Sequence, residues 1–409
     1  MISVGIWIVY PAIRTFARSF FDRSGTDFVW FDNYRTVFTS STLLTAIKNN
    51  AIWVGVVPAL VTSIGLVLAV LTERVRFAVA FRIAIFMPMA ISLFAAGVIW
   101  RIEYDQAPER GAINAVIAGV HDAIVPPGAL PSALPSTTAL AGSPRQGFVL
   151  RTPTEPGELA LLGLTGILPQ DVARSAKQAT LPQPQPGAIA GVAWRDFRPG
   201  GGTSGVVERE ELGLPGLTVE LRDRAGRKVG TTSTGANGTF RFPKLESGEY
   251  EVAIGAASFR QPFGGLSWLG PKLITPAVIA AYTWIWAGFA LVIIAAGLAA
   301  IPRDLLDAAR TDGATEWQVF RRITVPLLAP VLTVVFVTML INVLKVFDII
   351  LAVAPDSVQA DANVIALAMW RASFGGVNDF GLGSAIAVVL FLMVVPILAL
   401  NVRRFRREL

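Results

Sequence analysis

This chain of 409 residues is too apolar for a soluble globular protein, with 53% hydrophobic and 16% charged residues and a mean hydropathy of +0.57. It contains no cysteine, which excludes disulfides, thiol catalysis and cysteine-based metal sites. The net charge of +6 comes from basic residues scattered at the ends of apolar runs. A nucleic-acid surface would gather them on one soluble face with aromatic residues between them, so we expect no nucleic-acid partner.

Long apolar runs predict a chain that crosses a lipid bilayer several times. A spanning helix needs about 20 apolar residues. A first run, 1–13, is interrupted by Pro11 and spans only if the helix continues through Phe20. Five further runs are long enough: 51–71, 78–100, 274–301, 327–353 and 383–402. Six spans would place both termini on the same side of the membrane.

The basic residues indicate which side that is, because Lys and Arg accumulate in short cytoplasmic loops. They cluster in 71–82, in 302–326 and in 403–407. Residues 14–48 are also basic, although this arrangement places them outside. Three clusters outweigh one, so we expect both termini to be cytoplasmic.

Residues 302–326 form a charged segment between two apolar runs, and their pattern predicts two short helices. Pro302 suits a first helical turn, and Gly313 supplies a stop. Thr315 can then cap the second helix. That helix carries apolar side chains at three-residue spacing, Trp317, Phe320 and Ile323. It is predicted to end at Pro326. An amphipathic hairpin at a membrane surface needs a partner for its apolar face.

The segment resembles the cytoplasmic coupling loop of permease subunits in binding-protein-dependent ABC importers. That family's pattern is Glu-Ala-Ala, three residues, Gly, about nine residues and Ile-x-x-Pro. Asp307 replaces the leading Glu and keeps its charge. The alternative is an ordinary amphipathic surface hairpin. The resemblance implies a dock for an ATP-binding subunit, made by Asp307, Ala308, Ala309, Asp312, Gly313, Ala314, Phe320, Ile323 and Pro326.

Shorter matches resemble the carbohydrate branch of this family, the maltose and α-glucoside type. They are Asn33-Tyr34, the asparagine-containing stretch Ala46–Asn50 at the start of the second span, Gly111–Asn114 and Lys345–Asp348. The resemblance implies a non-enzymatic subunit without a cofactor, embedded in the lipid bilayer of the cell membrane. Its implied partners are a second homologous permease, an ABC ATP-binding subunit and an extracytoplasmic sugar-binding lipoprotein.

An insertion separates the two parts of this resemblance. Residues 123–186 are rich in Pro, Ala, Ser and Thr and predict an extended extracytoplasmic tether. Within it, 158–166 is apolar enough to form a short docked helix or strand. Residues 187–262 alternate apolar and polar side chains between turn signals, which predicts a β-sandwich. They resemble the B-type repeat domains of surface adhesins. Calcium-binding members carry several carboxylates after the first Trp, whereas Asp196 is followed by Phe197-Arg198-Pro199, so we expect no metal.

Few residues suggest chemistry. A Gly-Lys dipeptide is absent from the sequence, so the chain has no phosphate-binding P-loop, and His121 has no catalytic partner near it in sequence. Four residues are candidates for a translocation path: Trp100, Trp284, Trp286 and Asp348. The alternatives are an interfacial belt of Trp side chains, and an Asp348–Lys345 pair that anchors the external membrane face.

The sequence therefore predicts an all-α polytopic membrane protein of about six transmembrane helices with an inserted all-β sandwich domain. The predicted divisions are 1–122, 123–186, 187–262 and 263–409. The predicted function is that of a permease subunit in an ATP-driven sugar importer. Two alternatives stay open: a membrane-anchored surface adhesin, for which the coupling pattern has no use, and a secondary transporter, which predicts internal inverted repeats.

Overall fold

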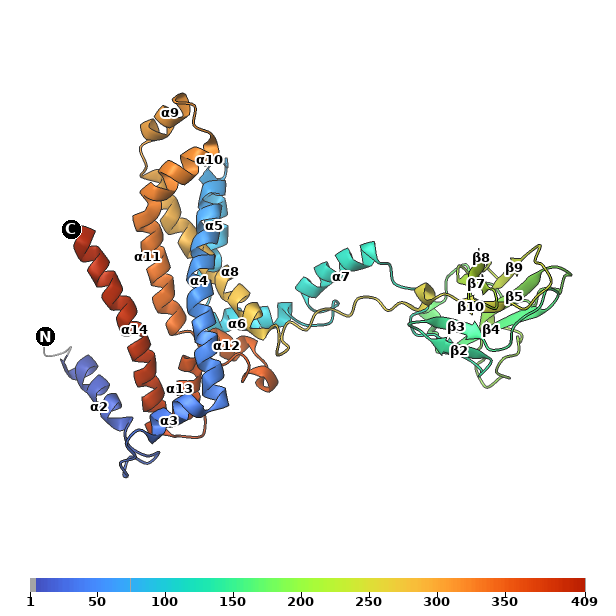
Figure 1. Cartoon of the computed structure of the whole chain (residues 1–409), viewed down its shortest axis with the longest axis horizontal. Helices are drawn as coiled ribbons and strands as arrows, with labels where there is room; N and C mark the ends of the chain where they lie inside the picture. The colour runs from blue at the N-terminus through green and yellow to red at the C-terminus, as the bar shows by residue number, and fades with distance from the viewer. Residues whose placement is uncertain (1–4, 74, 409) are drawn as a thin grey trace. The chain divides into compact units, whose positions relative to one another are not determined.

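The computed structural model describes residues 5–73 and 75–408, and the chain divides into two compact units. The first, called here the helical unit, comprises residues 1–112 and 266–409, and the second, the β unit, comprises residues 113–265. Figure 1 shows long helices in one and two small sheets in the other.

The helical unit is built on long apolar helices. Among the described residues, three are long and apolar enough to cross a membrane: α4 (Ser41–Glu73), α8 (Ile274–Ala299) and the continuous helix Glu316–Leu344. A fourth candidate is a pair, Ala78–Ala90 (α5 with a 3-10 turn) and α6 (Leu93–Glu103), bent by 102°. The remaining helices are α2 (Tyr10–Arg18), α3 (Asp32–Thr39), α9 (Arg303–Thr311), α12 (Asp348–Val353), α13 (Ile365–Phe374) and α14 (Phe380–Glu408).

Helix α8 is the central element of this unit, because α4, α5 and α11 (Val325–Leu344) all pack on it. Small residues allow a close approach: a Cβ added at Gly65 of α4 would collide with the Ala290 side chain of α8. Nearby, the fully buried Trp53 packs edge-on against Tyr282, with ring centroids 5.3 Å apart. Close packing through small residues holds helices together in lipid.

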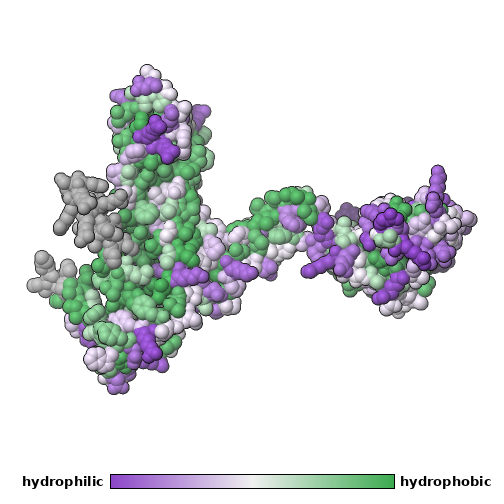
Figure 2. Space-filling model, in the orientation of Figure 1, coloured by the Kyte–Doolittle hydropathy of each residue, from purple (hydrophilic) through white to green (hydrophobic). Residues whose placement is uncertain are grey.

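The outer surface of the helical unit is apolar as well. Figure 2 shows hydrophobic residues over the middle of α4 and α11 and hydrophilic residues near the ends. Val67, Val334 and Leu392, for example, are 56%, 46% and 59% exposed. Soluble proteins bury most apolar side chains of this size, whereas such side chains are stable in contact with the hydrocarbon chains of a bilayer. This unit is therefore a multi-pass membrane domain.

Two predicted helix boundaries are wrong. The run predicted to span 327–353 ends at Leu344, because the backbone at Phe347 (φ −153°) leaves the helical region, and Asp348 then opens α12, which packs on α6. Pro326 does not end the second coupling helix: α10 (Glu316–Val319) continues through a π-turn at Phe320–Thr324 into α11. A π-turn shifts the hydrogen-bond ladder, which accommodates the missing proline donor.

The other predicted spans agree with helices in position. Runs 51–71 and 274–301 match α4 and α8, run 78–100 matches the bent pair, and run 383–402 lies within α14. Run 1–13 lies partly outside the described residues, but a π-turn at Gly5–Val9 and α2 extend helical structure to Arg18.

The β unit contains two five-stranded sheets. One has the order β1 (Leu134–Pro135), β4 (Leu159–Thr165), β5 (Ile189–Arg195), β6 (Leu212–Gly213), with β9 (Thr239–Phe242) also paired to β5. The other has the order β2 (Leu140–Ser143), β3 (Gly147–Leu150), β10 (Glu251–Ile254), β7 (Thr218–Arg222), β8 (Lys228–Ser233). Helix α7 (Ala112–Ile124) precedes the strands.

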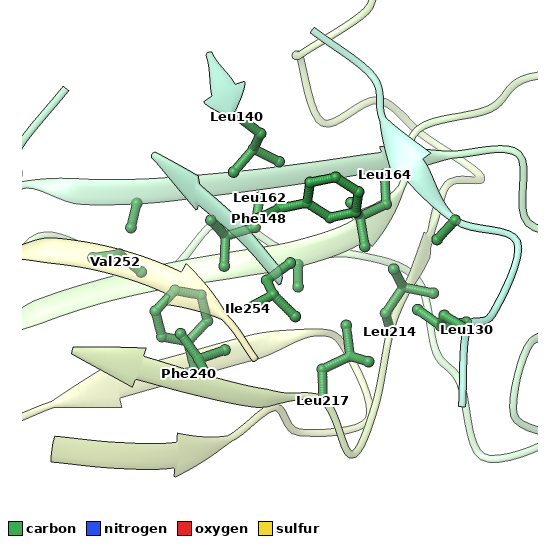
Figure 3. Close-up of a cluster of buried hydrophobic side chains, with 14 of the residues drawn as sticks. Leu130, Leu140, Phe148, Leu162, Leu164, Leu214, Leu217, Phe240, Val252 and Ile254 are labelled. Atoms are coloured by element: carbon green, nitrogen blue, oxygen red, sulfur yellow. The ribbon is translucent and has the colours of Figure 1, made fainter. Parts of the chain in front are cut away.

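Alternating apolar side chains from both sheets meet in one core, so the unit is a sandwich (Figure 3). Leu217, Val219 and Leu221 supply one side of it, and Leu162 and Leu164 of β4 supply the other. The prediction of an extended tether over 123–186 is therefore wrong, because that segment contributes β1 to β4. Only the short docked element allowed at 158–166 agrees, since it corresponds to β4. Strands β4 and β5 are parallel, which requires a crossover, and the proline-rich stretch 182–186 lies in it.

Candidate functional site

The charged segment between α8 and α11 folds into a defined helical hairpin, of which α9 is the first arm. Helix α9 ends in a Schellman motif: the Ala314 N–H donates to the Ala309 carbonyl (3.0 Å) and the Gly313 N–H donates to the Arg310 carbonyl (3.0 Å). Gly313 adopts φ +84°, a left-handed conformation that favours glycine. This confirms Gly313 as the predicted stop.

The second arm, α10, begins two residues later with a capping box. The Gln318 N–H donates to Thr315 Oγ1 (3.3 Å), and the Thr315 N–H donates to Gln318 Oε1 (2.8 Å). The predicted cap at Thr315 is confirmed. The stop and the start together leave only four residues, 312–315, between the two helices, and local hydrogen bonds hold this short turn.

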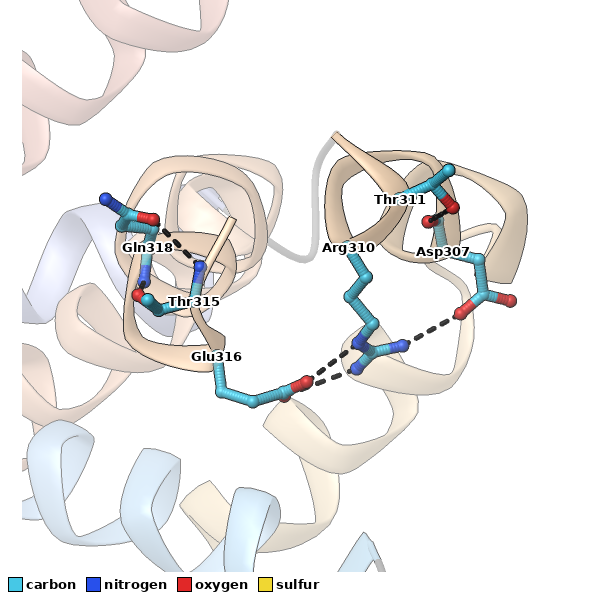
Figure 4. A network of polar contacts seen from close by, with 6 residues as sticks. All are labelled: Asp307, Arg310, Thr311, Thr315, Glu316 and Gln318. Atoms are coloured by element: carbon cyan, nitrogen blue, oxygen red, sulfur yellow. Dashed lines mark hydrogen bonds and ion pairs between the residues drawn. The ribbon is translucent and has the colours of Figure 1, made fainter. Parts of the chain in front are cut away.

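Arg310 ties the two arms together (Figure 4). Its Nη1 lies 2.9 Å from Asp307 Oδ1 on α9, and its Nε lies 2.8 Å from Glu316 Oε1 on α10. Hydrogen bonds to Glu316 and then to Asp307 raise the pKa of Arg310 above its ordinary value. The predicted Asp307 is thus one end of a three-residue clamp, called here the Arg310 clamp.

A pocket of about 890 Å³ lies beside the hairpin. The end of α4, the end of α8, α9 and α10 line it, through residues that include Leu71, Leu306, Asp307 and Phe320. Trp317 lines it too and is 65% exposed, and Leu305 on α9 is 49% exposed. The hairpin therefore presents apolar side chains and a concave surface to a partner, which is what a docking site requires.

The structure brings most of the predicted coupling residues into this hairpin. Asp307, Ala308, Ala309, Asp312, Gly313 and Ala314 belong to α9 and its turn, whereas Phe320, Ile323 and Pro326 lie in the π-turn and the start of α11. Arg310 and Glu316 were not predicted. The spacing of three residues between Asp307 and Arg310 was the available signal for the clamp.

The predicted path residues separate into three places. Trp100 of α6 and Trp284 of α8 pack edge-on with centroids 5.5 Å apart, and Trp284 is 39% exposed. Trp286 instead contacts Tyr282 and Phe289. Asp348 opens α12, and the described residues show no ion pair between it and Lys345, which caps α11.

Two buried asparagines of α4, Asn49 and Asn50, hold a loop of the helical unit. In the sequence they were noted only as part of the family resemblance, and no role was predicted for them. Asn49 Nδ2 donates to the carbonyls of Asp361 (2.7 Å) and Asn363 (2.8 Å), and the Ile365 N–H donates to Asn50 Oδ1 (2.8 Å). Both side chains thereby satisfy the backbone of the loop between α12 and α13. They fix that loop on α4 at the end of the unit away from the hairpin.

In the β unit, carboxylates stabilise a loop. Glu211 is 2% exposed and accepts from the Glu208 N–H (2.8 Å), while Asp196 Oδ2 accepts from the Gly205 N–H (2.6 Å). Burial raises the pKa of Glu211. Within residues 5–73 and 75–408, no group of three His, Cys, Asp or Glu side chains is arranged to hold a metal ion.

Comparison with known proteins agrees with this arrangement. Residues 240–405 match the family described as binding-protein-dependent transport system inner membrane component, and residues 188–262 match the SdrD B-like domain. The ABC transporter permease protein ORF1 of Caldicellulosiruptor sp. aligns with this chain at 33% sequence identity. The alignment spans 34% of this chain and 99% of that relative. The chain belongs to this family of inner-membrane permeases.

Two further similarities extend over the whole chain. The alpha-glucoside transport system permease protein AglF of Rhizobium meliloti is 28% identical over all of this chain and 80% of its own length. A crystal structure of a bacterial alginate ABC transporter in complex with an alginate pentasaccharide-bound periplasmic protein aligns with a TM-score of 0.56, covering 100% of this chain and 91% of that one. At 16% identity, the second similarity shows a shared fold only.

Proposed function

We propose that this chain is the permease subunit of an ATP-driven sugar importer and that the hairpin α9–α10 is its ATPase dock. The observation that carries the proposal is the hairpin itself: a rigid, partly apolar structure that projects between two apolar helices. The α-glucoside permease that the chain resembles over its whole length supports a di- or oligosaccharide as the substrate.

The proposed topology follows from the position of this dock. Six spans cross the inner membrane, and the hairpin end and both termini are cytoplasmic. The opposite end, which includes the loop held by Asn49 and Asn50, is then extracytoplasmic, as is the β unit. The basic clusters at 71–82 and 403–407 support this orientation.

The proposed partners are two copies of an ATP-binding subunit, a second homologous permease and an extracytoplasmic sugar-binding lipoprotein. ATP-driven closure of the ATP-binding dimer moves the hairpin as one body, because the Arg310 clamp holds α9 to α10. Helix α10 is continuous with α11 through the π-turn, so the movement reaches a spanning helix directly. Trp100, Trp284, Trp286 and Asp348 stay the candidates for the translocation path.

Co-purification tests this function. The full chain is expressed with a C-terminal tag beside its chromosomal neighbours, extracted in mild detergent and analysed by mass spectrometry. We expect an ATP-binding subunit and a second permease in fixed ratio, and ATP-dependent sugar uptake after reconstitution into liposomes. Uptake that persists without ATP, or a chain that purifies without any ATP-binding subunit, would contradict the proposal.

A further inference from the structure

A second pocket, of about 540 Å³, lies within the helical unit at the end away from the hairpin. It is bounded by α6, the turn that follows it, the turn before α8, and Pro355 after α12. The Tyr104 hydroxyl donates to the Ala277 carbonyl in the first turn of α8 (2.9 Å), which fixes the pocket at that end of the helix. Its volume is in the range of small-molecule sites, about 300–1,000 Å³.

Aromatic rings connect this pocket to the spanning helices. Trp268 and Tyr104 line the pocket, with centroids 5.7 Å apart and ring planes 35° apart. Tyr104 in turn lies 5.1 Å from Trp100, which packs edge-on against Trp284 of α8 at 5.5 Å. The four rings form a continuous series from the pocket to the partly exposed Trp284, called here the aromatic series.

Polar groups stand around the same pocket. Arg110 binds Asp105 with two contacts, Nε–Oδ2 at 3.0 Å and Nη2–Oδ1 at 3.1 Å, and the Ala107 N–H also donates to Asp105 Oδ1 (2.9 Å). These bonds fix the turn after α6. Arg101 and Gln106 line the pocket with exposed side chains, and the buried Nε1 of Trp268 has no acceptor among the described residues.

This combination suits one class of ligand. A sugar ring has an apolar C–H face, which packs on an aromatic ring, and a rim of hydroxyl groups, which donate and accept hydrogen bonds. Guanidinium and amide groups beside aromatic rings complement both parts. A hydroxyl oxygen near Trp268 would also provide the acceptor that its indole N–H lacks, after a small rotation of the ring.

We propose that this pocket is an outer sugar-binding site of the permease, an inference that rests on the proposed sugar-import function. Trp268 and Tyr104 form the aromatic floor, and Arg101 and Gln106 bind hydroxyl groups. The site holds a sugar ring before it enters the spanning helices, and the aromatic series leads from it to Trp284. Since α6 and the turns beside it supply these groups, we expect the purified subunit to bind sugar there.

Two measurements together test the proposal. Saturation-transfer NMR measures binding of maltose, trehalose and sucrose to the purified full chain, and uptake of the same sugars is measured with the complete transporter in liposomes. We expect Trp268→Ala to raise the Kd of the bound sugar at least about ten-fold. Trp268→Phe keeps an aromatic ring but removes the indole donor, so it should raise the Kd only about two- to five-fold. Gln106→Ala should raise the Kd several-fold. The Gln106 side chain is exposed, so its removal should not disturb the fold of the subunit. Trp30→Ala, on an exposed Trp outside the pocket, should not change the Kd.

The outcomes separate the two proposals. Import by the complete transporter without binding to the wild-type chain would overturn the outer site and leave the importer standing. Binding that survives both Trp268→Ala and Gln106→Ala would also overturn the outer site. Absence of both import and binding for all three sugars would overturn the outer site and the sugar-import function together.

Discussion

In the β unit, apolar side chains of strands such as β7 alternate and turn inward, whereas in the helical unit many large apolar side chains also lie on the outside. Leu162 of β4 is completely buried, and Leu392 of α14 is 59% exposed. Both are leucines in regular secondary structure, so the residue type alone does not determine burial. The solvent does: water drives Leu162 into a core, and lipid leaves Leu392 at the surface.

The two units are also stabilised by different kinds of interaction. The β unit is held by a hydrophobic core and by strand pairs between distant segments. In the helical unit, the hairpin is held by local hydrogen bonds, and small residues allow the helices to approach closely where they cross. A substitution that disturbs one unit should therefore leave the other intact, and the following predictions test this independence.

The largest effect is expected at Gly313. Proline cannot adopt φ +84° and removes the N–H that donates to Arg310, so Gly313→Pro should destroy the turn and lower ATP-dependent uptake more than about ten-fold. Ala309→Trp, at a half-buried position of α9, should uncouple uptake from ATP hydrolysis similarly. Gly313→Asn is the matched control, because Asn tolerates the left-handed conformation. Uptake and ATPase activity are measured in the same liposomes.

Both damaging variants should still insert and should leave the melting transition of the β unit unchanged. Normal uptake by Gly313→Pro at wild-type amounts in the membrane would refute the docking role of the hairpin.

The next effect concerns the two leucines. Leu162→Ala should destabilise the β unit by about 2–5 kcal/mol, because it leaves a cavity in a closed core. Leu392→Ala should leave the stability of that unit unchanged. Hydrogen exchange of β4 and β5 amides in the detergent-solubilised full chain measures this. If the two substitutions affected these amides equally, the units would not be independent.

A smaller effect is expected from removal of the β unit. Asp122 Oδ1 accepts from the Phe263 N–H (3.2 Å) and the Gly128 N–H donates to the Arg260 carbonyl (2.8 Å), so the two chain segments that enter the unit lie side by side. A short Gly/Ser linker can therefore replace residues 127–260. We expect normal insertion and permease pairing. Our hypothesis is that the β unit makes a second contact with the binding protein, so uptake should be several-fold lower at low sugar concentration without it.

Excess binding protein should restore uptake in this deletion variant. Equal uptake by the two proteins at every sugar and binding-protein concentration would show that the β unit serves a purpose other than import.

Local signals in the sequence were sufficient to predict the turn between the two arms of the hairpin, but they carry no information about contacts between distant segments. Gly313 and Thr315 act on backbone groups within five residues of themselves, so their roles were predicted. Strand β3 pairs with β10 about a hundred residues later, and nothing in the composition of 123–186 reveals that partner. The helix break after Leu344 likewise depends on the packing of α12 against α6, which lies far away in sequence.

The smallest effect is expected at Glu220, which joins β7 to β8. Hydrogen bonds from Lys228 (2.9 Å) and Arg222 (3.0 Å) lower the pKa of Glu220 below its ordinary value of 4.5. A lowered pKa means that the charged carboxylate stabilises the folded unit above the unfolded pKa, and that this stability is lost as pH falls through the folded pKa. Glu220→Gln should therefore cost about 1 kcal/mol at pH 7, and this cost should shrink as the pH falls below the ordinary pKa of 4.5 and through the lower folded-state pKa. Glu210→Gln, on an exposed loop, should cost nothing at neutral or acidic pH, and a Glu220→Gln penalty that did not shrink in acid would assign the loss to packing instead of charge.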